Sequence, residues 1–209
     1  DAKSNGAGHK YLIQHSAGSG KSNSISWLAH QLTELFDSTN TTNVFDTVIV
    51  VTDRTVLDAQ IQKNIKQFEL VAGIVQPITK GGKQLKEALE EGKKIIITTI
   101  QKFPVIAKEI GELQQNKFAI IIDEAHSRTS GSTLRQLNET LYKEIVQEKI
   151  EGEEEEEFDT NDELLQIIAQ TRKLLTNASY FAFTATPKNK TLELFGTKFI
   201  EDGKEKSKP

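Results

Sequence analysis

The stretch that decides the fold runs from Tyr11 to Ser22 and reads Tyr-Leu-Ile-Gln-His-Ser-Ala-Gly-Ser-Gly-Lys-Ser. Its apolar start predicts a β-strand that ends at His15, and the sequence after it predicts a helix beginning near Lys21. Gly18 and Gly20 allow backbone conformations that a side chain would block, so successive N–H groups can surround phosphate oxygens. The helix adds the positive end of its dipole. The stretch therefore predicts a phosphate-binding loop.

This loop has the pattern of a Walker A motif with one departure, because His15 stands where a glycine is usual. The pattern predicts that Lys21 reaches the β- and γ-phosphates of a nucleotide and that the Ser22 hydroxyl ligates Mg²⁺. The alternative is a solvated Gly/Ser turn, which the strand–loop–helix context disfavours. The predicted nucleotide-binding residues are Ala17, Gly18, Ser19, Gly20, Lys21 and Ser22.

Four further apolar runs are β-branched or aromatic, and they predict strands buried on both faces. These runs are Val48–Val51, Ile95–Ile97, Ile120–Ile122 and Tyr180–Phe183. Amphipathic stretches between them predict helices over Ser24–Phe36, Val56–Phe68, Lys83–Glu90, Ile100–Ile110 and Leu134–Val146. The alternation predicts an α/β fold, with a mostly parallel, doubly wound sheet and helices on both faces. We expect Trp27 and the phenylalanines in the core, because they fit periodic apolar patterns.

Composition narrows the function classes. The chain has 209 residues, 36% of them hydrophobic, which is enough for a core. The absence of cysteine excludes disulfide scaffolds, thiolate zinc sites and cysteine nucleophiles. No apolar run approaches the roughly 18 residues of a membrane helix.

The net charge of −4 is unevenly distributed. The window Glu148–Glu163 carries a net −9, which leaves +5 for the rest of the chain. We expect residues 148–163 to form an exposed, flexible acidic insertion, because like charges resist burial. The alternative is a DNA-mimicking or autoinhibitory flap. The mildly basic remainder allows a phosphate-backbone partner.

Two adjacent carboxylates, Asp123 and Glu124, follow the strand predicted over Ile120–Ile122. Ligands of parallel sheets lie at the carboxyl ends of strands, so this pair is expected beside the phosphate loop. Asp123 would hold Mg²⁺, through water, and Glu124 would polarise the attacking water. His126 would lie close enough to sense the γ-phosphate. The alternative for the pair alone is an ordinary exposed turn.

The motifs together resemble the superfamily 2 helicase and translocase engine. Asp123-Glu124-Ala125-His126 and the glycine loop carry this resemblance, as does Phe183-Thr184-Ala185-Thr186-Pro187, which resembles motif III. Val50–Leu57 resembles motif Ia, and Ile97–Phe103 resembles the Thr-rich motif. With His15, Ser127 and the Phe-Thr-Ala-Thr-Pro run, the chain looks like the motor (R) subunit of type I restriction enzymes.

This resemblance implies a RecA-like P-loop NTPase lobe that uses ATP and Mg²⁺, with Lys21 and Glu124 catalytic and Ser22 and Asp123 on the metal. It implies that His126, Thr184 and Thr186 couple nucleotide state to the grip on DNA. It implies contacts to the backbone of one DNA strand by Thr52, Arg54, Thr98, Thr99 and Gln101. The alternatives are that the threonines are β-formers at strand ends and that Arg54 is a salt-bridge partner.

The resemblance also implies an organisation: a first lobe over residues 1–200, a polar tail or linker over 201–209, a second lobe after it and a nuclease domain before it. The adenine-reading glutamine motif is not evident, and Gln14 lies inside the predicted first strand. The implied partners are duplex DNA and the methyltransferase and specificity subunits, in a prokaryotic cytoplasm and without a membrane. Two alternatives stay open, namely another superfamily 2 helicase acting on DNA or RNA, and a nucleotide-binding scaffold that does not hydrolyse ATP.

Overall fold

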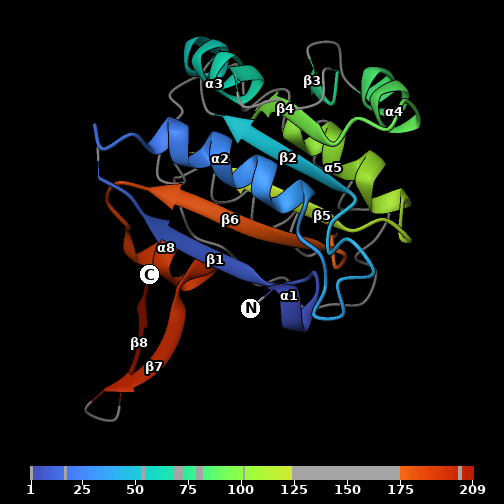
Figure 1. Ribbon diagram of the computed structural model, residues 1–209. Coiled ribbons are helices and arrows are strands. Elements are labelled where there is room, and N and C mark those ends of the chain that lie inside the picture. The colour runs from blue at the N-terminus through green and yellow to red at the C-terminus, as the bar shows by residue number, and fades with distance from the viewer. Residues whose placement is uncertain are drawn as a thin grey trace.

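The main sheet contains six strands among the described residues, all parallel, in the order β1-β6-β5-β2-β4-β3 (Figure 1). The computed structural model describes residues 2–16, 18–52, 55–67, 73–78, 82–100, 102–123, 175–201 and 204–209. The strands are β1 (Lys10–Gln14), β2 (Thr47–Thr52), β3 (Val75–Pro77), β4 (Ile95–Thr99), β5 (Phe118–Ile122) and β6 (Ala178–Thr184). The predicted parallel sheet is therefore confirmed.

Helices cover both faces of this sheet, as a doubly wound fold requires. The described helices are α1 (Ala2–Asn5), α2 (Lys21–Thr33), α3 (Thr55–Gln67), α4 (Gly82–Glu90), α5 (Phe103–Glu112) and α8 (Asn189–Phe195). Buried side chains of α2 and α3 belong to one core cluster, and those of α4, α5 and α8 belong to the other. The helix predicted over Leu134–Val146 and the acidic window 148–163 lie outside the described residues.

The strands β1, β2, β4, β5 and β6 contribute side chains alternately to the two cores. In β2, Val48 and Val50 pack into the cluster with α2 and α3, whereas Ile49 and Val51 pack into the other. Successive side chains of a strand point to opposite faces, so a strand covered by helices on both sides must be apolar at every position. This is why the predicted runs did not alternate with polar residues.

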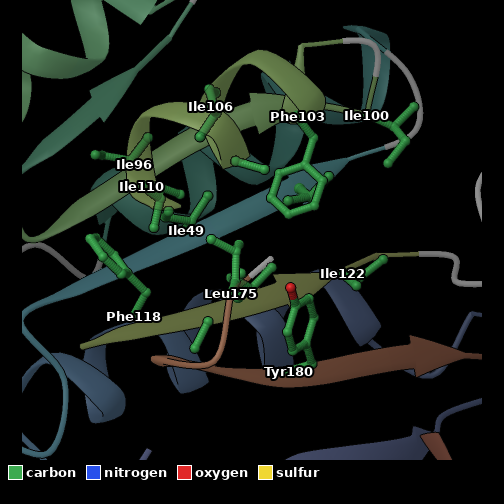
Figure 2. Close-up of a cluster of buried hydrophobic side chains, with 14 of the residues drawn as sticks. Ile49, Ile96, Ile100, Phe103, Ile106, Ile110, Phe118, Ile122, Leu175 and Tyr180 are labelled. Carbon is green, nitrogen blue, oxygen red and sulfur yellow. The ribbon is translucent and has the colours of Figure 1, made fainter. Parts of the chain in front are cut away.

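The core on the α4–α5 face is built from large side chains that meet over the middle of the sheet (Figure 2). Phe103, Ile106 and Ile110 of α5 belong to this core together with Phe118 of β5, and all four are fully buried. Each fully buried residue of this size contributes about 1.5–3 kcal/mol of transfer free energy. Burial of these side chains thus stabilises the packing of α5 on the sheet.

Element boundaries differ from the predicted ones at identifiable residues. Helix α2 begins at Lys21, as the phosphate loop predicted and three residues before the amphipathic stretch at Ser24, because Gly20, with φ of 90°, turns the chain into the helix. It ends at Thr33, and Phe36 instead forms an isolated antiparallel bridge with Asn43. Helix α5 begins at Phe103 rather than Ile100, with a proline in its first turn, where proline is favoured.

The expected burial was wrong for Trp27 and Phe36, which are 63% and 43% exposed. The buried stripe of α2 is Ile25, Ala29 and Leu32, which follow the helical spacing i, i+4 and i+7. Trp27 lies two positions after Ile25, about 200° around the helix, and therefore faces away from the core.

The polar tail or linker predicted over residues 201–209 contains a β-strand. Residues 204–208 form β8 (Lys204–Lys208), which pairs antiparallel with β7 (Thr197–Glu201) and extends away from the main sheet (Figure 1). A contact between the Lys208 ammonium and the Phe199 ring (5.4 Å to its centroid) and a 2.6 Å ion pair between Lys206 and Glu201 support the pairing. The hairpin crosses the boundary predicted at residue 200.

Among the helices that the structure describes, none combines the length and the apolar character that crossing a membrane would demand.

Gly196 joins α8 to this hairpin through a close approach of backbone. A Cβ added there would lie 2.5 Å from the carbonyl oxygen of Leu192 and 2.9 Å from that of Lys208. We predict that Gly196→Ala lowers the free energy of unfolding by about 1–3 kcal/mol, because neither backbone atom can yield without moving α8 or β8. Urea denaturation measures this. The neighbouring exposed change Thr197→Ala should stay within about 0.5 kcal/mol of wild type, and equal midpoints for the two variants would contradict the prediction.

Candidate nucleotide-binding site

The candidate site lies at the carboxyl edge of the sheet, where β1, β6 and β5 end side by side. The His15 backbone N–H donates to the Thr184 carbonyl (2.9 Å), which extends the β1–β6 ladder one residue beyond β1. The Asp123 N–H donates to the Val51 carbonyl (2.9 Å), which does the same for β5 and β2. The residues that follow these strands are therefore held by backbone hydrogen bonds at one edge, where parallel sheets bind ligands.

The glycine loop has the backbone that its sequence predicts. Gly18 and Gly20 have φ of 75° and 90°, in the left-handed region that favours glycine. Gly20 caps α2, and its carbonyl accepts hydrogen bonds from the N–H groups of Asn23 (2.9 Å) and Ser24 (3.1 Å). Gly18, Ser19 and Gly20 are exposed, so the loop at the N-terminus of α2 is open to a ligand. A helix N-terminus of this kind attracts anions.

Lys21 and Asp123 meet at this edge as a buried ion pair. The Lys21 ammonium lies 3.3 Å from Oδ1 of Asp123, and the side chains are only 11% and 3% exposed. Lys21 opens α2, whereas Asp123 follows β5, and β6 lies between β5 and β1. The expected convergence of these two residues is therefore present in the structure. A buried carboxylate needs a cation beside it, because removing an unpaired charge from water is costly.

The donor set around Asp123 fits Mg²⁺ bound together with a nucleotide. It offers one carboxylate and the hydroxyl of Ser22, in the first turn of α2, where Ser26 Oγ donates to the Ser22 carbonyl (2.7 Å). Mg²⁺ keeps several waters and takes one or two protein oxygens with phosphate oxygens supplying the rest. Within the described ranges, no cluster of three or more His, Cys, Asp or Glu side chains could hold a metal by itself.

Several predicted site residues lie outside the described part of the chain. They are Ala17, Arg54, Gln101, Glu124 and His126. Their roles stay predictions.

The predicted threonine sites are at strand ends, but most of them are buried. Thr52, Thr98 and Thr99 are 0%, 1% and 5% exposed, and Thr52 Oγ1 donates to the Thr98 carbonyl (3.4 Å). Such burial is typical of β-formers within a sheet. Thr184 is also buried, whereas Thr186 is exposed. DNA contact by the three buried threonines stays a prediction, and in this arrangement their hydroxyls do not lie on the surface.

One set of site contacts was missed by sequence reasoning. The His15 ring bridges two serines: Nδ1 lies 2.7 Å from Ser19 Oγ, and Nε2 lies 2.9 Å from Ser24 Oγ. Ser19 Oγ also donates to the Ser16 carbonyl (2.5 Å). The sequence marked His15 as a departure from the usual glycine, but the partners of its ring required the coordinates.

Comparison with known families identifies the class. A family model described as SWI2/SNF2 ATPase matches residues 2–202, nearly the whole chain. The chain therefore belongs to the SWI2/SNF2 ATPase family, and it is a helicase-type or translocase-type ATPase domain. Membership in this family implies the use of ATP. No curated protein sequence matches the chain.

Solved structures agree with the fold. The UvsW helicase from bacteriophage T4 matches with a TM-score of 0.50 and 14% identity, over 86% of this chain and 47% of that one. The Hef helicase domain of Pyrococcus furiosus matches with a TM-score of 0.52 and 15% identity, over 90% of this chain and 32% of that one. The fold is therefore that of a RecA-like helicase lobe, as predicted. The chain spans less than half the length of these helicases.

The buried pair gives a prediction about stability. Lys21→Met leaves the Asp123 carboxylate buried without the ammonium, and Asp123→Asn leaves the ammonium without the carboxylate. We expect each single change to cost about 3–5 kcal/mol in the free energy of unfolding, and the double variant to cost less than their sum. Urea denaturation of the wild type, the two single variants and the double variant measures the coupling free energy between Lys21 and Asp123.

The matched control is the same set of single and double variants at Lys86 and Glu109. These residues form a 2.8 Å ion pair in which Lys86 is 57% exposed. Its coupling should be about 0–1 kcal/mol, because water screens exposed charges. Additive effects at Lys21 and Asp123 would contradict the assignment of a coupled pair.

Proposed function

We propose that this chain is the ATP-hydrolysing first lobe of a DNA translocase, specifically of the motor subunit of a type I restriction enzyme. The observation that carries the nucleotide site is the ion pair between Lys21 and Asp123 beside the glycine loop. It supports a site in which the residue that binds phosphate and the residue that holds the metal act on one Mg²⁺–triphosphate.

The residues of the lobe divide the work. The loop from Ala17 to Ser22 binds the β- and γ-phosphates through its N–H groups and the Lys21 ammonium. Ser22 and Asp123 would hold Mg²⁺, which when bound neutralises charge on the β- and γ-phosphate oxygens. Glu124 accepts a proton from the attacking water and orients it in line with the γ-phosphate.

The place of β6 in the sheet supports a coupling role for its carboxyl end. This strand lies between the strands that lead to Lys21 and Asp123, and the Thr184 carbonyl bonds the first residue of the loop. A change at the γ-phosphate can therefore reach Thr184 and Thr186 through adjacent backbone. In our proposal, His126 and these threonines transmit the nucleotide state to the lobe's grip on DNA.

The restriction-motor assignment rests on sequence. His15, the Asp-Glu-Ala-His-Ser run at 123–127 and the Phe-Thr-Ala-Thr-Pro run at 183–187 resemble that family. Its partners would be duplex DNA, a second RecA-like lobe and a nuclease domain of the same subunit, and the methyltransferase and specificity subunits. The second lobe would supply an arginine to the γ-phosphate, a contribution of roughly 10³–10⁵ in rate in related engines. The 209-residue chain alone should therefore bind ATP and hydrolyse it slowly.

Binding of ATP to the 209-residue chain tests the phosphate loop. Lys21→Ala should abolish binding measured by calorimetry. Lys21→Arg keeps a charge beside Asp123 and provides a folded comparison, and we expect it to bind far more weakly, because a guanidinium does not replace the compact ammonium. Lys83→Ala, at a lysine 92% exposed on α4, should bind like wild type. Unchanged affinity in Lys21→Ala would refute the site.

Turnover by the full-length subunit tests the motor. Glu124→Gln should keep the ATP affinity and lower kcat by roughly 10²–10⁴, because it removes the general base. Glu112→Gln, at an exposed position that ends α5, serves as the control and should hydrolyse ATP normally. Normal hydrolysis by Glu124→Gln would remove that residue from its role, and no hydrolysis by wild type would favour the scaffold.

The same assay separates a DNA motor from other helicases. Duplex DNA should stimulate hydrolysis, RNA should not, and the subunit should displace a third strand from a triplex without unwinding a plain duplex. Unwinding, or stimulation by RNA, would favour another superfamily 2 helicase.

A further inference from the structure

The residue at the start of the phosphate loop, His15, contacts the sheet edge, the loop and the first turn of α2. The His15 backbone N–H reaches the end of β6 at Thr184 (2.9 Å). Its ring reaches forward to Ser19 in the loop (2.7 Å) and to Ser24 in the first turn of α2 (2.9 Å). One half-buried residue therefore joins the sheet edge through its backbone, and the loop and the helix through its ring.

The tautomer of the His15 ring follows from the hydrogen bonds that the ring and Ser19 form. Ser19 has one hydroxyl hydrogen, and it is directed to the Ser16 carbonyl at 2.5 Å. Ser19 Oγ must then accept a hydrogen bond, so Nδ1 of His15 carries the proton and donates it. In the neutral imidazole Nε2 is an acceptor and takes the hydrogen of Ser24. All three hydrogen bonds are satisfied by this tautomer, which we assign from the network.

We propose that His15 is a positioning residue for nucleotide binding, which holds the loop in its phosphate-binding shape by bridging Ser19 and Ser24. This inference rests on the proposed nucleotide site and adds to it a residue that does not touch the nucleotide. In the usual loop a glycine stands at this position and has no side chain to form such a bridge.

The loop needs such a bridge for an entropic reason. Gly18 and Gly20 have wide conformational freedom, and residues 16 and 18–20 are exposed, so core packing does not hold them. If only a fraction of molecules has the binding shape, the apparent dissociation constant rises by the inverse of that fraction. Two neutral hydrogen bonds, each worth about 1 kcal/mol, can change this fraction by roughly 5- to 30-fold.

A merely structural role makes a different prediction. The ring also lies near Phe183, with centroids 6.3 Å apart, and could act only as a cover for the sheet edge. If the ring is only a cover, its loss should lower stability, and a change of Ser24 should not alter ATP affinity. If the ring positions the loop, a change of Ser24 should weaken ATP binding. The effect of Ser24→Ala on ATP affinity therefore distinguishes the two roles.

The test measures ATP binding to the 209-residue chain by calorimetry, with the urea midpoint of each variant measured without nucleotide. We expect His15→Ala to weaken binding by about 5- to 30-fold and Ser24→Ala by about 2- to 10-fold. Adding Ser24→Ala to His15→Ala should change nothing further, because the bond is already lost. Thr33→Ala is the matched control, since it removes one hydroxyl hydrogen bond (to the His30 carbonyl, 2.8 Å) at the far end of α2, and should bind normally.

Conservative variants dissect the bridge. The amide of His15→Gln extends to the position of Nε2 and keeps the bond to Ser24, so its affinity should remain sensitive to Ser24→Ala. The shorter amide of His15→Asn occupies the position of Nδ1, keeps the bond to Ser19 and should be insensitive to Ser24→Ala. Both should bind more tightly than His15→Ala.

Two outcomes overturn the inference while leaving the proposed function intact. The first is normal ATP affinity in His15→Ala. The second is additivity of the effects of His15→Ala and Ser24→Ala on ATP affinity. In both cases Lys21→Ala must still abolish ATP binding. Failure of the wild-type chain to bind ATP would instead overturn the nucleotide site and this inference together.

Discussion

The whole site depends on the burial of one carboxylate, that of Asp123, beside the Lys21 ammonium. These residues belong to elements far apart in the sequence, and they meet because the strand order places β6 between β1 and β5. The sheet therefore brings both charges to one edge before any ligand is considered. A carboxylate that is 3% exposed must have a cation beside it, and the site can offer two, the ammonium of Lys21 or a magnesium ion carried by a nucleotide. In the proposed function, the same requirement that stabilises the fold at this edge favours the binding of a metal–phosphate complex there.

Much of the architecture could be predicted because burial on both faces leaves a strong pattern. Each central strand contains a run of consecutive apolar residues, and such runs are uncommon outside parallel sheets. The phosphate loop was equally predictable, because only glycine adopts the φ values of Gly18 and Gly20 without strain. The meeting of Lys21 and Asp123 followed from the rule that parallel strands present their carboxyl ends together.

The remaining features depend on contacts that no local pattern encodes. Strand β3 is three residues long, contains Gln76 and Pro77 and pairs only with β4, so it lacks the apolar run that marked the others. Trp27 is apolar, yet its angular position on α2 places it in solvent. Thr98 and Thr99 have residue types suited both to phosphate contact and to a sheet interior, and their residue types alone do not indicate that they are buried.

The network around His15 shows a similar limit. A histidine in place of glycine is visible in the sequence, but its partners are chosen by the turn of the loop and the start of α2. Helix α2 begins three residues earlier than the apolar periodicity indicates, and this brings Ser24 into the first turn, within reach of the ring. The capping conformation of Gly20 thus determines the position of a side chain four residues further on.

The two-stranded ribbon of β7 and β8 has a consequence for how copies of this chain behave at high concentration. Both of its outer rims carry backbone groups that no neighbouring strand of the described chain satisfies, and such rims readily recruit strands from other molecules. Lys206 and Lys208 lie two positions apart on β8, so their side chains stand on the same face of the ribbon, beside its outer rim. Lysines on an edge strand disfavour pairing with a second copy, so they protect the ribbon against self-association and fibre growth.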